Sequence, residues 1–437
     1  MWSWILAYRN LGRNIRRSLA TGLAIGAGFV GMLLISAYLY RAEIAIQTST
    51  VYLNHKGHIA LFKKQSLDEF TYKPSKYLIA KDEQLKIAEI LKSLESDIEF
   101  TGRYLTGTGL ITSQVNGVSK STPFLATAVE PDVYQRILRH SEVHKWTPDW
   151  TFPETVEKAD RLLENPALIS LTASMGLLIG KKIPFDNYTG ADRDVQLIGK
   201  SYFGDLNALD AQLGLRHTTG MALAEDTSLY LSLSQLQSLY ATDGIQYWAL
   251  FLKDPNTMGR IQTRLKKEFD EQSLNIDVIP YNDEVWGAYY VGSIGFLIVI
   301  ASFFVVLICG AVILSVVNTT TLGIFERYRE IGTLRATGFA PKWIYSLFWK
   351  ENFILSSIAL TIGYILAEWI AFLVNSADIK FHPPGTQGDI RFLLVTHYQI
   401  TIELACLVFV INFISTMAAV RKSTRMPIVN LLAANGG

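Results

Sequence analysis

The stretch ERYREIGTLRATGFAPKWI, residues 326–344, decides how the rest of this chain is interpreted. It is rich in charge, yet a long apolar segment precedes it and another follows it. Its apolar residues Ile331 and Leu334 recur at helical spacing among charged neighbours. Gly338 can end such a helix, and Pro341 can begin the next one. The stretch therefore predicts a short amphipathic helix between two membrane spans.

The overall composition points to a membrane protein with a sizeable water-facing part. The chain has 437 residues, of which 49% are hydrophobic and 18% charged, and its mean hydropathy is +0.22. Its net charge of +1 gives no indication of a nucleic-acid partner. The two cysteines, Cys309 and Cys406, both lie in apolar runs, so we expect packing residues rather than a disulfide framework.

Four apolar segments are long enough to cross a bilayer, which takes roughly 20 residues. The second is longer than a span needs, so part of it is expected to project from the membrane as a stalk. The first could be a cleaved signal peptide, but the arginines before it and its long apolar core favour an uncleaved anchor. The predicted spans are residues 19–40, 286–325 (stalk and span), 352–377 and 397–420.

The orientation follows from three groups of basic residues near the span ends. With four spans, all three groups fall on one side, which the positive-inside rule makes cytoplasmic. The cytoplasmic parts are then the two chain ends, residues 1–18 and 421–437, and the loop 326–350. The parts outside the cell membrane are residues 41–285 and the short loop 378–396. The groups are Arg9, Arg13, Arg16 and Arg17; Arg327, Arg329, Arg335, Lys342 and Lys350; and Arg421, Lys422 and Arg425.

The outer region, residues 41–285, shows mixed helix and strand signals. Asn116 and Gly117 predict a hairpin turn between two strands. Residues 246–281 read as strand, helix, strand. Periodicity is weaker in residues 131–220, which we expect to form an inserted subdomain. The predicted fold class is a membrane α-helical bundle of four spans, one plus three, with a large α+β extracytoplasmic domain.

The sequence contains no recognisable catalytic constellation, so we predict no catalytic, cofactor-binding or metal-binding residues. The segment DVQLIGKS, residues 194–201, resembles the end of a phosphate-binding loop, but Asp194 stands where the pattern requires glycine. His140 and His144 could share one helix face, although no third metal ligand is evident. No serine lies in a G-x-S-x-G pattern. The chain is therefore expected to be non-catalytic.

Glu368 stands well inside the third apolar segment. A carboxylate there is costly unless it faces protein or water. Two interpretations stay open: a residue at a helix interface, or a residue of an intramembrane cavity.

The longer stretch VNTTTLGIFERYREIGTLRATGFAPKWI, residues 317–344, resembles the cytoplasmic coupling segment of the FtsX-like permease family. This is the MacB, LolC/LolE and FtsX group of ABC transporters, also called type VII. The matching residues are Asn318, Glu326, Arg327, Glu330, Ile331, Gly332, Leu334, Arg335, Ala336 and Gly338.

Other segments resemble the same family. Residues 6–28 are similar to its amphipathic entry helix and first span. Residues 418–433 are similar to its C-terminal tail, with Arg421, Pro427 and Leu431 at the matching positions. GHIALF near Gly57 resembles an early strand of the lipoprotein-exporter branch, whereas Lys181 replaces the acid expected in a later element of that branch.

The resemblance implies that the permease and the ATPase are separate subunits with different roles. Two permease chains, identical or paralogous, would pair with two cytoplasmic ATPase subunits, and those subunits would bind ATP and Mg²⁺. Ile331 and Leu334 would fill a groove of the ATPase, with Arg327, Glu330 and Arg335 setting the register. ATP-driven motion would then pass along the stalk to the outer domain, a mechanism called mechanotransmission.

Three functions fit this resemblance. The first is extraction of a lipid or lipoprotein from the inner (cytoplasmic) membrane of a bacterium. The second is a MacB-like tripartite efflux pump with a periplasmic adaptor. The third is FtsX-like signalling across the membrane to a periplasmic partner without transport. A stand-alone membrane enzyme has no supporting residues.

Overall fold

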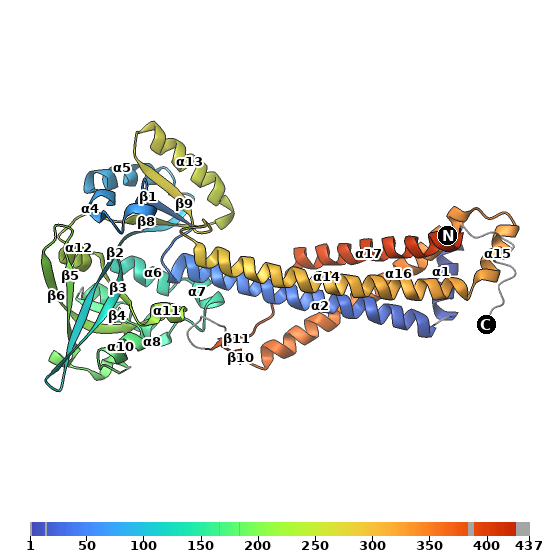
Figure 1. The fold of residues 1–437 in the computed structure, drawn as a ribbon, viewed down its shortest axis with the longest axis horizontal. Helices are drawn as coiled ribbons and strands as arrows, with labels where there is room; N and C mark the ends of the chain where they lie inside the picture. The colour runs from blue at the N-terminus through green and yellow to red at the C-terminus, as the bar shows by residue number, and fades with distance from the viewer. Residues whose placement is uncertain (1, 14, 166, 183, 383–388, 425–437) are drawn as a thin grey trace. The chain divides into compact units, whose positions relative to one another are not determined.

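A computed structural model describes residues 2–13, 15–165, 167–182, 184–382 and 389–424. The chain divides into two compact units. We call the first the helical unit; it comprises Met1–Ala42, Gly295–Ile379 and Phe392–Gly437. The second, the sheet unit, comprises Glu43–Ile294 and Lys380–Arg391. Figure 1 labels the elements of both.

Long helices dominate the first unit. Four stretches of described chain are apolar and long enough to cross a membrane: Ile15–Leu53, Ala288–Phe325, Lys342–Ser376 and Tyr398–Arg421. The predicted bundle of one plus three membrane-length helices is thus confirmed. The helices are α1 (Trp2–Arg13), α2 (Ile15–Thr48), α14 (Ala288–Phe325), α15 (Tyr328–Ala336), α16 (Pro341–Ser376) and α17 (Tyr398–Thr424).

The bundle is held by close helix packing and by polar pairs between helices. A Cβ atom on Gly28 of α2 would lie 2.5 Å from Val312 of α14, so these helices meet where no side chain intervenes. Ser356 of α16 accepts a hydrogen bond of 3.2 Å from Asn412 of α17. Small residues and side-chain hydrogen bonds are the usual means of association where lipid replaces water.

Helix α14 is much longer than a bilayer is thick. Its 38 residues extend about 57 Å at 1.5 Å per residue, compared with about 30 Å for the hydrocarbon core. No charged residue interrupts it. This length agrees with the predicted stalk.

Nine strands form the main sheet of the second unit, in the order β3-β7-β4-β6-β5-β2-β8-β1-β9. Strand β3 also pairs with β2, so β2, β3, β7, β4, β6 and β5 close into a ring. The strands are β1 (Ile59–Lys63), β2 (Ile98–Val115), β3 (Val118–Val129), β4 (Leu168–Leu171), β5 (Asp194–Lys200), β6 (Leu206–Arg216), β7 (Ser228–Ser232), β8 (Tyr247–Leu252) and β9 (Ile276–Pro280), with the separate pair β10 (Lys380–Phe381) and β11 (Ile390–Arg391).

Short helices cover this sheet. They include α5 (Lys81–Lys92), α12 (Leu233–Tyr240) and α13 (Met258–Glu271), whose apolar residues join one core with the strands. The others are α3 (Ser66–Glu69), α4 (Pro74–Tyr77), α6 (Pro131–Leu138), α7 (Ser141–Trp146), α8 (Pro153–Lys158), α9 (Arg161–Glu164), α10 (Ala173–Leu178) and α11 (Ala222–Glu225), together with the π-helix η1 (Ser49–Leu53) and the 3-10 turns η2 (Phe185–Asn187), η3 (Gly190–Arg193) and η4 (Pro255–Thr257).

Two local predictions for this unit are confirmed. Asn116 and Gly117 link β2 to β3 with φ values of +52° and +76°. These left-handed conformations are those of a two-residue type I′ hairpin. The strand–helix–strand segment is β8, α13 and β9.

The expected inserted subdomain at residues 131–220 is not a separate body. Strands β4, β5 and β6 lie in that segment and belong to the same sheet as β2. Strand β5 pairs directly with β2, with Gly109 opposite Gly199. The segment DVQLIGKS is therefore mainly a sheet strand.

Candidate functional site

Helix α15 lies between α14 and α16, at the end of the bundle where α1 is also found (Figure 1). Arg327 is its N-cap, with φ −111°, and interrupts the helix that precedes it. Glu330 lies in its first turn and Arg335 in its last. Both charges are favourable with respect to the helix dipole.

A glycine cap ends α15, as predicted. Gly338 has φ +95°, a conformation that favours glycine. The Gly338 N–H donates to Arg335 O at 3.2 Å, and the Phe339 N–H donates to Leu334 O at 3.0 Å. This pair of bonds is a Schellman motif. Pro341 then begins α16, so both local predictions for this turn are confirmed.

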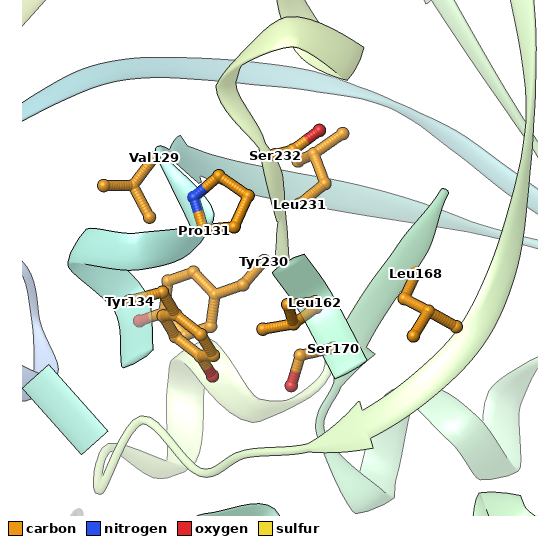
Figure 2. Close-up of a pocket in the computed structure, with 9 residues that line it drawn as sticks. All are labelled: Val129, Pro131, Tyr134, Leu162, Leu168, Ser170, Tyr230, Leu231 and Ser232. Atoms are coloured by element: carbon orange, nitrogen blue, oxygen red, sulfur yellow. The ribbon is translucent and has the colours of Figure 1, made fainter. Parts of the chain in front are cut away.

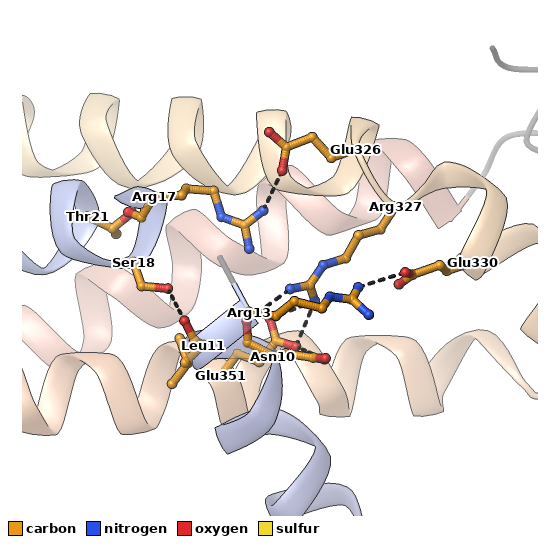
Figure 3. Close-up of polar contacts among 10 residues, drawn as sticks. All are labelled: Asn10, Leu11, Arg13, Arg17, Ser18, Thr21, Glu326, Arg327, Glu330 and Glu351. Atoms are coloured by element: carbon orange, nitrogen blue, oxygen red, sulfur yellow. Dashed lines mark hydrogen bonds and ion pairs between the residues drawn. The ribbon is translucent and has the colours of Figure 1, made fainter. Parts of the chain in front are cut away.

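A buried polar cluster fixes the start of α15 to two other helices (Figure 3). Arg327 Nη1 donates to both carboxylate oxygens of Glu351 on α16, at 3.0 and 3.3 Å. Asn10 Nδ2 of α1 donates to the same carboxylate at 2.5 Å. Arg327 Nη2 also reaches the backbone oxygen of Asn10 at 3.5 Å. We call Asn10, Arg327 and Glu351 the polar hub.

Two further ion pairs join α15 and the residues just before it to the N-terminal helices. Arg17 of α2 lies 3.2 Å from Glu326, and Arg13 of α1 lies 2.7 Å from Glu330 (Figure 3). The Glu326 and Glu330 side chains are 61% and 55% exposed. Pairs of this kind contribute little, because water screens them.

The polar hub contributes differently because it is buried. The Arg327 and Glu351 side chains are only 5% and 8% exposed. Removing one partner of such a pair leaves an uncompensated charge and typically costs about 3–5 kcal/mol. The hub therefore makes the start of α15 dependent on α1 and α16.

The inner side of α15 is part of the bundle core, which corrects two expectations. Ile331 is 5% exposed and packs with Ile324, Ile344 and Val420. Arg327 is engaged in the polar hub. Neither side chain presents a surface that an ATPase groove could accept, because helices of the same chain already cover both. Gly332 is buried as well.

The outer side of α15 carries small and polar residues. Arg329, Thr333, Ala336 and Thr337 are exposed, whereas Leu334 and Arg335 are half-buried. The Thr333 and Thr337 hydroxyls donate to backbone carbonyls one turn earlier. We call Arg329, Thr333, Ala336 and Thr337 the outer stripe. Phe339 follows it in the chain and is 42% exposed.

A small cavity of about 30 Å³, lined by both polar and apolar residues, adjoins the hub. Such a volume is enough for a water molecule where polar partners are present. Its lining residues are Leu11, Arg17, Ser18, Thr21, Thr319, Thr320, Phe348, Glu351, Asn352 and Leu355.

Glu368 lies apart from this site, on the same helix as Glu351. The two residues are 17 positions apart, which corresponds to about 26 Å along α16. Glu368 is half-buried, and its Oε1 has no hydrogen-bond partner among the described residues. Tyr364 lies one helical turn before it.

The sheet unit contains a small apolar pocket of about 20 Å³, bordered by Tyr134, Ser170 and Tyr230 among others (Figure 2). The Ser170 hydroxyl pairs with His217 Nδ1 at 3.0 Å, and Ser228 pairs with the other imidazole nitrogen. Burial lowers the pKa of His217 to about 3, so this imidazole stays neutral. The hydroxyl–imidazole contacts are internal packing contacts.

The two histidines of HSEVH do not share a helix face. His140 is the N-cap of α7, and its Nδ1 accepts from the Glu142 N–H at 3.3 Å. His144 is exposed. Among the residues that the structure describes, no group of three or more His, Cys, Asp or Glu side chains is arranged to hold a metal ion.

Sequence reasoning missed two members of the hub. Glu351 stands immediately before the predicted third span, and Asn10 lies in the entry helix. Glu351 could have been singled out because it is a carboxylate at the boundary of a predicted span. No local pattern marked Asn10. The predicted tail positions Arg425, Pro427 and Leu431 lie outside the described residues.

Comparison with known proteins finds one family model that matches the part of the chain containing α15. Residues 277–428 match the family model described as FtsX-like permease C-terminal. Over 189 residues the chain is 28% identical to ABC transporter permease YtrF of Bacillus subtilis (strain 168). That alignment covers 40% of this chain and 43% of the relative, so less than half of YtrF is matched.

Two solved structures resemble half of the chain. The extracellular domain of the noncanonic ABC-type transporter YknZ from Gram-positive bacteria aligns with a TM-score of 0.31 and 11% identity, over 51% of this chain and 98% of that one. The periplasmic region of MacB from Actinobacillus actinomycetemcomitans aligns with a TM-score of 0.33 and 10% identity, over 51% and 88% of the two chains.

Proposed function

Because residues 277–428 carry an FtsX-like permease domain, we propose that the chain is the non-catalytic permease subunit of an ABC transporter. A separate cytoplasmic ATPase binds ATP and Mg²⁺ and docks on α15. A second permease, identical or paralogous, completes the transporter in the inner membrane of a bacterium, with both chain ends cytoplasmic.

One observation carries this proposal: α15 is fixed on its inner side and open on its outer side. The polar hub joins it to α1 and α16 through Arg327, Glu351 and Asn10. The outer stripe of Arg329, Thr333, Ala336 and Thr337 is exposed. A pre-organised surface loses little freedom on binding, which favours a mechanical contact.

Helix α14 is proposed as the transmitting element. It ends two residues before α15 begins, so a displacement of α15 acts directly on its cytoplasmic end. Its length of about 57 Å, from its 38 residues, allows it to act beyond the hydrocarbon core. The outer domain then responds mechanically, and no substrate has to pass through the bundle.

For the cargo, we propose a lipid or a lipoprotein that is extracted from the inner membrane. The support is the resemblance of the segment near Gly57 to the lipoprotein-exporter branch. MacB-like efflux with a periplasmic adaptor, or FtsX-like signalling to a periplasmic partner, would use the same coupling helix.

The experiment is purification of the full chain from its native membrane after gentle crosslinking, followed by identification of the captured proteins. The wild-type chain should recover an ATPase subunit. Thr333→Trp, which adds bulk to the exposed stripe, should lose it.

Thr361→Trp is the matched control. Thr361 is also exposed, and its hydroxyl also donates to the carbonyl one turn earlier, but it lies within α16. This variant should retain the ATPase. Recovery of no ATPase by the wild-type chain would contradict the proposal. Capture of a lipoprotein would support extraction, whereas capture of an adaptor or a hydrolase would favour the other two functions.

A further inference from the structure

We infer that Phe339 is the apolar anchor by which this permease binds its ATPase. Arg329 precedes it in the chain and Lys342 follows it, and both add positive charge. The groove of the ATPase that receives Phe339 therefore has an apolar floor and an acidic rim. The inference rests on the proposed function, because it names the contact made by α15. Phe339 takes the anchoring role expected of Ile331, because the Ile331 side chain is buried in the bundle core.

Phe339 is a large apolar side chain held in a defined place at the end of α15. Its N–H donates to Leu334 O at 3.0 Å in the glycine cap. Its ring packs against Trp343 of α16, with the ring centroids 4.8 Å apart. Even so, 42% of the residue is exposed. An exposed aromatic ring that is already ordered is the usual form of a binding hot spot.

The neighbouring residues of α15 allow a close approach to this ring. Thr333, Ala336 and Thr337 are small, and the two hydroxyls are already hydrogen-bonded to the helix backbone. A partner that seats on this stripe meets few polar groups that need new hydrogen bonds. Among residues 333–340, all of which the structure describes, Phe339 is the only large apolar residue that is exposed, because Leu334 is half-buried.

The acidic residues near Phe339 are neutralised by ion pairs, whereas two basic residues near it are not. The acidic residues Glu326 and Glu330 are each paired with an arginine of α1 or α2. Arg329 and Lys342 are exposed, and neither forms an ion pair with another described residue. The surface available to a partner is thus basic, and charge complementarity calls for carboxylates around the receiving groove.

The test measures binding of the recovered ATPase subunit to the full chain in lipid nanodiscs. Phe339→Ala should weaken binding about 30-fold, as expected for a hot-spot aromatic. Phe372→Ala, a matched control at an exposed phenylalanine of α16, should leave it unchanged. Arg329→Glu should weaken binding about tenfold, and added salt should weaken the wild type.

A second variant separates anchoring from local packing. Trp343→Ala removes the ring that supports Phe339 but leaves Phe339 in the chain. If Phe339 is the anchor, the Phe339→Ala variant should bind the ATPase at least tenfold more weakly than the Trp343→Ala variant. Equal losses of ATPase binding in the two variants would overturn the inference. Unchanged binding by Phe339→Ala, or tighter binding by Arg329→Glu, would overturn this inference alone. Failure of the wild-type chain to bind the ATPase would overturn the proposed function together with it.

Discussion

Replacing Glu351 with glutamine should loosen α15 without unfolding the bundle. Glu351 is the carboxylate that both Arg327 and Asn10 contact. Without its charge, Arg327 stays buried, with a side chain only 5% exposed and no compensating anion. The low end of the range for such a loss is about 3 kcal/mol. That corresponds to a roughly 150-fold increase in the local opening equilibrium.

Amide hydrogen exchange measures this opening directly, since local opening and global unfolding are separate processes. The amides of Ile331 and Gly332, on the inner side of α15, should exchange roughly 150-fold faster in Glu351→Gln than in the wild type. Glu368→Gln is the control, because it removes a carboxylate of the same helix that lies outside the hub. It should leave α15 unchanged.

The double variant Arg327→Met/Glu351→Leu tests whether the uncompensated charge is the cause. Replacing both partners of a buried pair by apolar side chains is often neutral or stabilising. Exchange of α15 should therefore be slower in the double variant than in Glu351→Gln. If the double variant opens as readily as the single one, or if Glu351→Gln changes exchange less than threefold, the reasoning about the hub is refuted.

Three other predictions follow from single features. Gly338→Ala should cost about 1–2 kcal/mol and fray the end of α15 in hydrogen exchange, because its φ is +95°. Gly28→Leu should weaken the α2–α14 contact at Val312 and lower the thermal midpoint of the helical unit. Burial lowers the pKa of both His55 and His217 to about 3. Burial also lowers the pKa of His58 to about 4. Since the unfolded state binds protons on these three imidazoles below pH 6.5 and the folded state does not, stability should be nearly flat above that pH and fall by about 6 kcal/mol by pH 5, measured by chemical denaturation.

Local signals predicted the parts of the structure that depend on neighbouring residues. Gly338 and Pro341 indicated the turn after α15 because each restricts its own backbone. Asn116 and Gly117 indicated the hairpin for the same reason. The four membrane-length helices were predictable because apolar length alone defines them.

Long-range pairing was not predictable in this way. Asn10 and Glu351 are 341 positions apart, so no periodic pattern links them. The burial of Ile331 depends on Val420 of α17, and helical spacing shows that a face is apolar without showing what covers it. Similarly, β5 belongs to the main sheet because of its pairing with β2, about 85 residues earlier.

The most direct test of the coupling role places a photo-crosslinking amino acid at Thr333 in the full chain in cells. Thr333 is exposed on α15, and Thr361 on α16 provides the matched position within the membrane helix. The account predicts a crosslink from position 333 to an ABC ATPase subunit and none to that protein from position 361. Crosslinks from position 333 only to lipid, or only to proteins that bind no nucleotide, would contradict it.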